Sequence, residues 1–377
     1  MKRGRRTSFG LIVVGAWLCY SMNGQNQAVK PGAFSRWRPT RELVGADYVG
    51  NQVCLQCHKE KASIESANAM AHAAESGRDC ASLKAYQDLT FTNGPYAYRF
   101  LREGKRNLYV VSDGQQELKA PILFCFGQGR IGQTYILEYD GKLYESRVSY
   151  FRQIGKLDFT ILHPHSPPVS LVEALGRQLT PDAASGCFSC HTTGAVRNGQ
   201  LQIDQMVPGV RCEACHGPGE KHAAAMKARD MRDLKIFPPA HIDSEVLTQE
   251  VCGACHRSFE NVLSLPGQDG INNIRYQPYR IFNSPGHRGD PRISCMACHD
   301  PHDRLTQDVN FYDSKCLACH VTKTERARST DRSAPPCPTA DNRCVTCHMQ
   351  KIDLPGAHGT FTDHWIRVVR SGQPIPR

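Results

Sequence analysis

The sequence predicts a fold of short α-helices and loops built around covalently tethered cofactors, with a small antiparallel β-rich insert. Three observations predict this fold: a repeated cysteine-containing pentapeptide, the short stretches of chain between successive copies, and one long segment with the composition of β-structure. The chain has 377 residues, of which 40% are hydrophobic, 22% are charged and 18 residues are cysteines. Because so many cysteines are unusual, their spacing is the first feature to interpret.

Most of the cysteines belong to seven copies of the pattern C-x-x-C-H. The pattern attaches c-type haem, because two thiols add to the two vinyl groups of one porphyrin and the adjacent histidine binds its iron. The predicted cofactor is therefore haem c, seven per chain, and the chain is predicted to have a multihaem cytochrome c fold. The predicted attachment residues are Cys54, Cys57, His58, Cys187, Cys190, His191, Cys212, Cys215, His216, Cys252, Cys255, His256, Cys295, Cys298, His299, Cys316, Cys319, His320, Cys344, Cys347 and His348.

Two other readings of these cysteine pairs are weaker. Zinc sites also use C-x-x-C pairs, but zinc does not require a histidine directly after the second cysteine. Histidine accounts for only 16 of 377 residues, so its presence after all seven pairs is not a chance event. Disulfide oxidoreductase motifs also lack this histidine, and one chain would not need seven of them.

The N-terminus predicts a secretion signal over residues 1–24. A basic start is followed by a short apolar stretch from Phe9 to Tyr20 and then by small or polar residues. The stretch is too short to span a bilayer, so we expect cleavage, no transmembrane anchor, and a periplasmic or cell-surface location. Four cysteines lie outside the motifs, and cleavage of the signal would remove Cys19. Export would place the other three, Cys80, Cys125 and Cys337, in an oxidising compartment, where at most one disulfide can form among them. The sequence does not choose the pair.

The formal net charge of +10 does not predict a nucleic-acid partner. Signal cleavage removes basic residues, and each haem adds two propionate carboxylates that Arg and Lys side chains can pair with. No basic run is interleaved with aromatic residues as on a nucleic-acid-binding face. We therefore expect redox proteins, one electron donor and one acceptor, as partners.

The sixth ligand of each iron decides between electron transfer and catalysis, because an open iron can bind a small molecule. Nine histidines lie outside the motifs, which is enough to fill seven irons. His72 and His222 fall in the predicted helical stretches Lys59–Ser76 and Glu220–Lys235. The predicted distal ligands are His72, His163, His222, His287, His302, His358 and His364, while His165 and His241 are spare and would serve as proton donors beside an open haem.

Motif spacing divides the chain. The predicted first haem module covers residues 25–84, and a β-rich insert without haem covers 85–165. Within the insert, Asp113-Gly114 and Asp140-Gly141 separate runs rich in aromatic and branched residues, which is typical of hairpins. Six motifs follow so closely in residues 166–370 that their haems must form much of the core themselves. Residues 371–377 are expected to be a frayed tail.

Several segments resemble the cytochromes related to the tetrahaem electron acceptor of hydroxylamine oxidoreductase. The resemblance rests on Val53 to Ala74, on Cys187 to Ala223 with its paired motifs, on Ser284-Pro-Gly-His-Arg-Gly before Cys295, and on the ending Phe361-Thr-Asp-His364. Gly127-Gln-Gly-Arg and Leu143-Tyr-Glu resemble the β-rich insert of such proteins. The resemblance implies periplasmic or cell-surface electron transfer, with His72, His222, His287, His302, His358 and His364 as distal ligands.

The sequence therefore favours an electron carrier with closely spaced bis-histidine haems over a catalyst. The first alternative is a multihaem reductase or oxidase in which one open haem acts on a small nitrogen oxide or similar substrate. The second is an assembly subunit that uses the β-rich insert to dock a partner or a second protomer.

Overall fold

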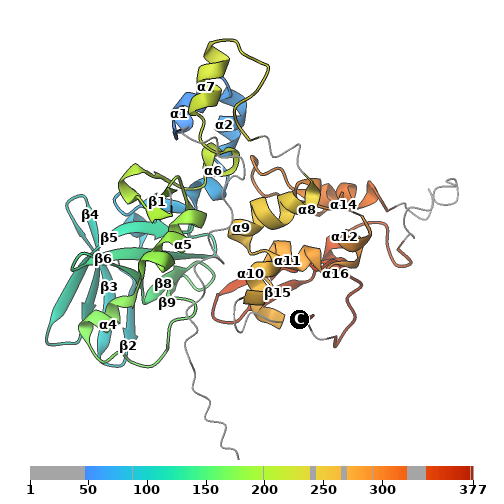
Figure 1. Cartoon of the computed structure of the whole chain (residues 1–377). Coiled ribbons are helices and arrows are strands. Elements are labelled where there is room, and N and C mark those ends of the chain that lie inside the picture. The colour runs from blue at the N-terminus through green and yellow to red at the C-terminus, as the bar shows by residue number, and fades with distance from the viewer. Residues whose placement is uncertain are drawn as a thin grey trace, which may run out of the picture.

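The computed structural model describes residues 47–86, 88–197, 199–237, 243–264, 270–290, 292–320, 337–373 and 375–376. Figure 1 shows a β-sheet region on one side and a helical region on the other, with α1, α2 and α7 projecting above them. The predicted signal, residues 1–24, and the spare histidine His241 lie outside the described residues. Within the described residues, no helix is long and apolar enough to cross a membrane.

The sheet region is a single antiparallel arrangement of ten strands, ordered β10-β7-β6-β5-β4-β3-β2, with β1 paired to β5 and β8 paired to β6 and β9. The sequence predicted a small sheet within the insert, whereas the observed sheet has ten strands. Two strands come from outside it, since β1 precedes it and β10 follows it. The strands are β1 (Ala74–Ser76), β2 (Thr90–Asn93), β3 (Tyr96–Glu103), β4 (Arg106–Ser112), β5 (Glu117–Phe126), β6 (Gly132–Tyr139), β7 (Lys142–Ser146), β8 (Val148–Phe151), β9 (Lys156–Phe159) and β10 (Gly176–Gln178).

The structure confirms both predicted hairpins. β6 and β7 pair with Tyr139 opposite Lys142, which leaves Asp140 and Gly141 as a two-residue turn. Both turn residues have positive φ, 50° and 65°, as the twist-compatible tight turn requires. At the other turn, the Asp113 carboxylate accepts hydrogen bonds from the backbone N–H groups of Gln115 and Gln116.

The two faces of the sheet bury different elements. One face carries the largest apolar cluster, which includes Tyr98, Tyr109 and Tyr135 and packs under α3 (Ala81–Ala85) and α4 (Leu171–Leu175). The opposite face packs Phe126 and Ile136 against α5 (Pro181–His191), the helix that contains the second motif. The sheet therefore acts as a platform for that motif.

The helical half has little polypeptide core of its own. Among its described residues, the two buried apolar clusters contain four and three buried residues. The helices are short and the connections long, as the prolines and glycines predict. They are α1 (Asn51–Leu55), α2 (Lys59–Glu65), α6 (Cys212–His216), α7 (Glu220–Lys227), α8 (Ser244–Val246), η5 (Leu247–Cys252), α9 (Gly253–His256), α10 (Phe259–Ser264), α11 (Gln277–Phe282), α12 (Pro285–Gly289), α13 (Cys295–Cys298), α14 (Val309–Leu317) and α16 (Cys344–His348), and a hairpin of β15 (Lys351–Leu354) and β16 (Gly359–Thr362) lies near the end.

Two helices are shorter than the sequence predicted. The stretch Lys59–Ser76 is helical only as far as Glu65, and its end forms a short 3₁₀ turn over Met70–His72 and then strand β1. The competing interaction is tertiary, because Ala74–Ser76 pair with Phe124–Phe126 of β5. The stretch Glu220–Lys235 is helical only to Lys227, and Arg229 lies beyond its end with a φ of 56°.

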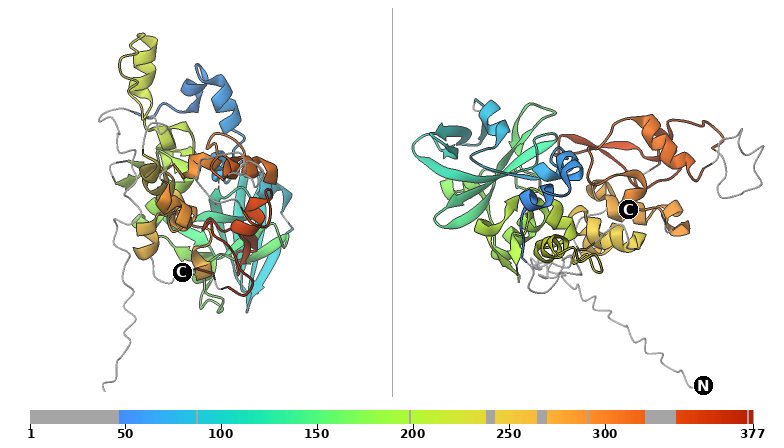
Figure 2. Two further views of the ribbon diagram at one scale, coloured as in Figure 1. Left: turned by 90° about the vertical axis from the view of Figure 1, so that its right-hand side faces the viewer. Right: turned by 90° about the horizontal axis from the view of Figure 1, so that it is seen from above.

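The two described residues at the C-terminal end are held in place. Ile375 packs against the cluster around Ile274, and the carbonyl oxygen of Pro376 accepts a hydrogen bond of 2.8 Å from Arg280. These contacts join the segment expected to be a tail to the helical half. The view from above in Figure 2 (right) shows this half beside the sheet, and the view on the left shows it in front of the sheet.

Candidate haem sites

All seven motifs lie within the described residues, and each begins in a short helix. The second motif is the best anchored. Thr180 caps α5 by accepting a hydrogen bond from the Ala183 N–H, and Pro181 occupies the first turn. Between the two cysteines, Phe188 is fully buried and packs edge-on against Phe124 and Phe126 of the sheet. The sheet thus fixes the helix that presents Cys187, Cys190 and His191.

The motif helices contact one another. α1 contacts α6, α5 contacts α9, η5 contacts α13, α13 contacts α14, and α14 contacts α16. At four of these contacts, cysteine thiols of different motifs are close enough to shift each other's pKa: Cys54 and Cys212, Cys190 and Cys255, Cys252 and Cys295, and Cys316 and Cys344. The first motif is therefore beside the third, and the second, fourth, fifth, sixth and seventh follow one another.

Three motif histidines each lie near a second histidine ring. The ring centroids of His58 and His222 are 6.2 Å apart, those of His216 and His302 are 6.2 Å apart, and those of His299 and His364 are 6.3 Å apart. Two imidazoles sharing one metal ion have centroids about 6 Å apart, because each metal–nitrogen bond is about 2 Å and each centroid lies about 1 Å behind its nitrogen. The three centroid distances therefore match the spacing expected for two imidazoles on one iron.

The hydrogen bonds of His222, His302 and His364 favour metal binding. Nδ1 of His222 lies 2.6 Å from the Leu234 carbonyl oxygen, and Nδ1 of His364 lies 2.9 Å from that of Thr362. Nδ1 of His302 lies 3.0 Å from the Asp300 carboxylate. An Nδ1–H donated to an oxygen fixes the tautomer that leaves Nε2 free to bind a metal.

The same pattern holds for other rings. Three motif histidines have Nδ1 on a carbonyl oxygen: His191 on Ala73, His216 on Phe237 and His348 on Arg367. Nδ1 of His287 likewise lies 2.7 Å from the Ile293 carbonyl oxygen, so this hydrogen bond leaves its Nε2 available for a metal.

The remaining predicted ligands are placed differently, because Nε2 of each is engaged with the protein. It lies 3.0 Å from the Ser66 carbonyl oxygen in His72, 3.1 Å from the Glu145 carboxylate in His163, and 2.6 Å from the Asp158 carboxylate in His358. Binding iron through Nε2 would require these hydrogen bonds to break. The spare histidine His165 stacks on Phe159 with a centroid distance of 4.2 Å.

Burial keeps several of these rings uncharged. It is the main cause that lowers the pKa of His364, to about 4, and that lowers the pKa of His216 and His299. A neutral imidazole has the lone pair that a metal ligand needs.

Two polar residues that the sequence did not single out position the first and third sites. Glu213, inside the third motif and 2% exposed, accepts hydrogen bonds of 2.8–2.9 Å from the N–H groups of Val49, Gly50 and Gly219. Asn68 donates to the carbonyl oxygens of Pro301 and Asp303, at 2.8 Å and 2.6 Å, on either side of His302. The only sequence signal was that Glu213 lies between two haem-binding cysteines.

A buried charged cluster holds the segment that contains His364. The Arg280 guanidinium donates two hydrogen bonds of 2.8 Å to the Asp363 carboxylate, and both side chains are 0% exposed. Arg367 donates to the same carboxylate at 2.6 Å. Ser284 also donates to the His364 carbonyl oxygen at 3.1 Å. Because Asp363 directly precedes His364, this cluster fixes the backbone on which the ring is mounted.

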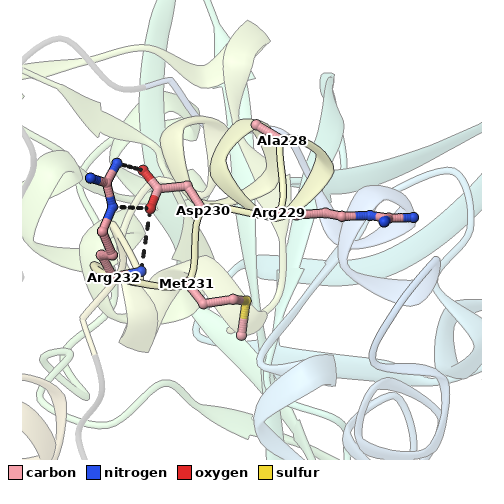
Figure 3. A pocket seen from close by; sticks show the side chains of 5 residues that line it. All are labelled: Ala228, Arg229, Asp230, Met231 and Arg232. Carbon is pink, nitrogen blue, oxygen red and sulfur yellow. Dashed lines mark hydrogen bonds and ion pairs between the residues drawn. The ribbon is translucent and has the colours of Figure 1, made fainter.

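A hollow of about 560 Å³ lies on the described surface beyond the end of α7. Figure 3 shows its five lining residues, with Asp230 and Arg232 paired and Arg229 directed away from them. None of the five is a motif cysteine or histidine. Among the described residues, no three His, Cys, Asp or Glu side chains converge as they would around a bare metal ion.

Comparison with known proteins agrees with the motifs. Residues 168–217 match the family model described as cytochrome c554 and c-prime. The chain is 24% identical over 196 residues to the multiheme cytochrome MtrA of Shewanella baltica (strain OS185), covering 49% of each chain, so it spans about half of that relative. The fold is similar to that of the outer cell wall cytochrome OcwA, with a TM-score of 0.52, 16% identity, and 85% of this chain and 80% of that chain covered. Together with the repeated C-x-x-C-H motif, these similarities show that the chain is a multihaem c-type cytochrome.

Proposed function

We propose that the chain is an exported cytochrome with seven haems c that carries electrons between a redox-protein donor and a redox-protein acceptor. The observation that carries the proposal is the set of three opposed histidine pairs, 6.2–6.3 Å apart. An iron with both axial positions filled exchanges electrons with little rearrangement and has no site for substrate.

The proposed proximal ligands are the seven motif histidines. The proposed distal ligands are His222 for the first haem, His302 for the third and His364 for the fifth. His287 is proposed as a fourth distal ligand, because its Nδ1 is held and its Nε2 is left over. His72, His163 and His358 stay predictions as ligands, since Nε2 of each is hydrogen-bonded to the protein.

The proposed electron path follows the contacts between motif helices. It runs through the second, fourth, fifth, sixth and seventh motifs in that order, with the third and first motifs forming a side branch. The branch adjoins the end of the second motif, because α6 contacts Thr192–Thr193, which follow His191 directly.

The proposed location is periplasmic or at the cell surface. It is supported by the basic and apolar N-terminal sequence and by the name of the similar OcwA, an outer cell wall cytochrome. The relation to the electron acceptor of hydroxylamine oxidoreductase stays a prediction.

The test is the spin state of the ferric protein, purified from a host that matures c-type cytochromes. We expect low-spin signals from the haems whose histidines are opposed. Substituting His302 by Ala should convert one haem to a high-spin form that binds carbon monoxide after reduction. His165→Ala is the matched control and should leave the spectrum unchanged. A His302→Ala protein with the wild-type spectrum would refute the ligand assignment.

A second candidate function is a reductase with an open haem acting on a small nitrogen oxide. It is favoured by one observation: among the described residues, no second histidine ring faces His191, His256, His320 or His348 at the distance seen in the three pairs. A high-spin signal in the wild-type ferric protein that disappears on adding nitric oxide would support it over pure electron transfer.

A further inference from the structure

Cys80 and Cys125 lie outside the haem motifs, and both side chains are 0% exposed. Cys125 is on β5, opposite Glu75 of β1 and Tyr135 of β6. Cys80 follows β1 and begins α3, and its N–H donates a 3.0 Å hydrogen bond to the Ser76 carbonyl oxygen. Both cysteines belong to the apolar cluster on the same face of the sheet.

The two thiols meet inside this cluster. Sγ of Cys80 lies 3.2 Å from Oε1 of Gln133, a residue of β6 whose side chain is on the same face as Tyr135, the partner of Cys125. Proximity to the Cys125 thiol lowers the pKa of the Cys80 thiol to about 7, while burial raises the pKa of Cys125.

We propose that Cys80 and Cys125 form a disulfide in the mature protein, which ties the first haem module to the sheet. Two S–H bonds break and one Sγ–Sγ bond forms, releasing two protons and two electrons. The electrons reduce the disulfide of a thiol–disulfide oxidase in the export compartment to its dithiol, through a mixed disulfide.

The location decides when this happens. Because both sulfurs are fully buried, exchange with the oxidase must occur before β5 and α3 close over the cluster, and the finished bond is shielded from reductants. The linkage would act on the first haem module, residues 25–84, because Cys80 lies in the last part of that module, after the first motif and His72. Cys337 is not part of this cluster, so the proposed disulfide does not involve it.

The experiment is peptide mapping of the haem-loaded protein after unfolding in an alkylating reagent without reductant. Trypsin releases Cys80 in the peptide 79–84 and Cys125 in the peptide 120–130. We expect these two peptides as one linked species, lighter than their sum by two hydrogens, which separates on reduction. Alkylated Cys80 and Cys125 before reduction, or a link from either one to Cys337, would overturn the proposal.

A variant series gives a second readout. Cys125→Ala should lower the melting temperature by roughly 4–16 °C and release Cys80 for alkylation. Cys80→Ala with Cys125→Ala should melt no lower than the single variant, since the linkage is already lost. Cys337→Ser is the matched control and should leave the linked species unchanged. Equal melting of reduced and unreduced wild-type protein, with equal alkylation, would also refute the linkage.

Discussion

The buried pair of Arg280 and Asp363 offers the sharpest test of how the distal side of the fifth site is held. Asp363→Asn keeps the shape of the side chain and removes its charge. Arg280 and Arg367 then lose their common counter-charge, and the first of them is fully buried. Removing one partner of a buried ion pair costs about 3–5 kcal/mol, because the remaining charge stays desolvated.

That cost corresponds to a fall in melting temperature of roughly 6–20 °C. The assay is thermal unfolding followed by the Soret band, with the ferric spin state recorded below the transition. We also expect a high-spin fraction, since His364 directly follows Asp363. Glu103→Gln is the control, because Glu103 pairs with Lys119 and both are about half exposed; it should cost about 0–1 kcal/mol. An Asp363→Asn protein that melts within a degree of the wild type would refute the reasoning.

Three further predictions concern the contacts between motifs. Glu213→Gln should destabilise the protein by about 1–3 kcal/mol in chemical denaturation, because an amide N–H₂ would face the Gly50 N–H; unchanged stability would contradict this. Asp313, 5% exposed, accepts hydrogen bonds from the N–H groups of Arg343 and Cys344 at the start of α16, so Asp313→Asn should cost about 1 kcal/mol at pH 7. Burial raises the pKa of Asp313, but these hydrogen bonds outweigh burial, so the pKa is lowered. The wild type should therefore be more stable than the variant above about pH 4, and this difference in stability should vanish as the pH falls through the lowered pKa. A difference in stability that grows in acid would contradict this prediction. Gly209→Ala should also destabilise the protein, because a Cβ would lie 2.0 Å from the Ala71 carbonyl oxygen at a φ of 83°; equal melting of the two proteins would exclude this close contact.

The prediction of haem c depends on local sequence alone, since a haem attachment motif is five consecutive residues. The two hairpins were also local, because Asp140-Gly141 needs only its own backbone preferences. Where the helices end could not be predicted from local sequence. Ala74–Ser76 leave the predicted helix because a strand fifty residues later pairs with them. No pattern in residues 59–76 contains that information.

Distal ligands show the same limit. His222, His302 and His364 were proposed among seven candidates, but their partners were not, because a histidine's partner depends on tertiary contacts such as that of Asn68 with Pro301. The hydrogen bond at Nε2 of His163 also depends on a residue distant in sequence, Glu145 of strand β7. The sequence therefore predicts which residues can bind iron, while packing decides which of their nitrogens are free.

The most direct test of the account is the intact mass of the purified protein from a host that matures c-type cytochromes. The account predicts the mass of the processed chain plus seven haems, with one haem lost for each motif in which both cysteines are changed to Ala. A soluble, correctly folded protein that carried fewer than seven haems, or none, would contradict the central claim that all seven C-x-x-C-H motifs hold the cofactor.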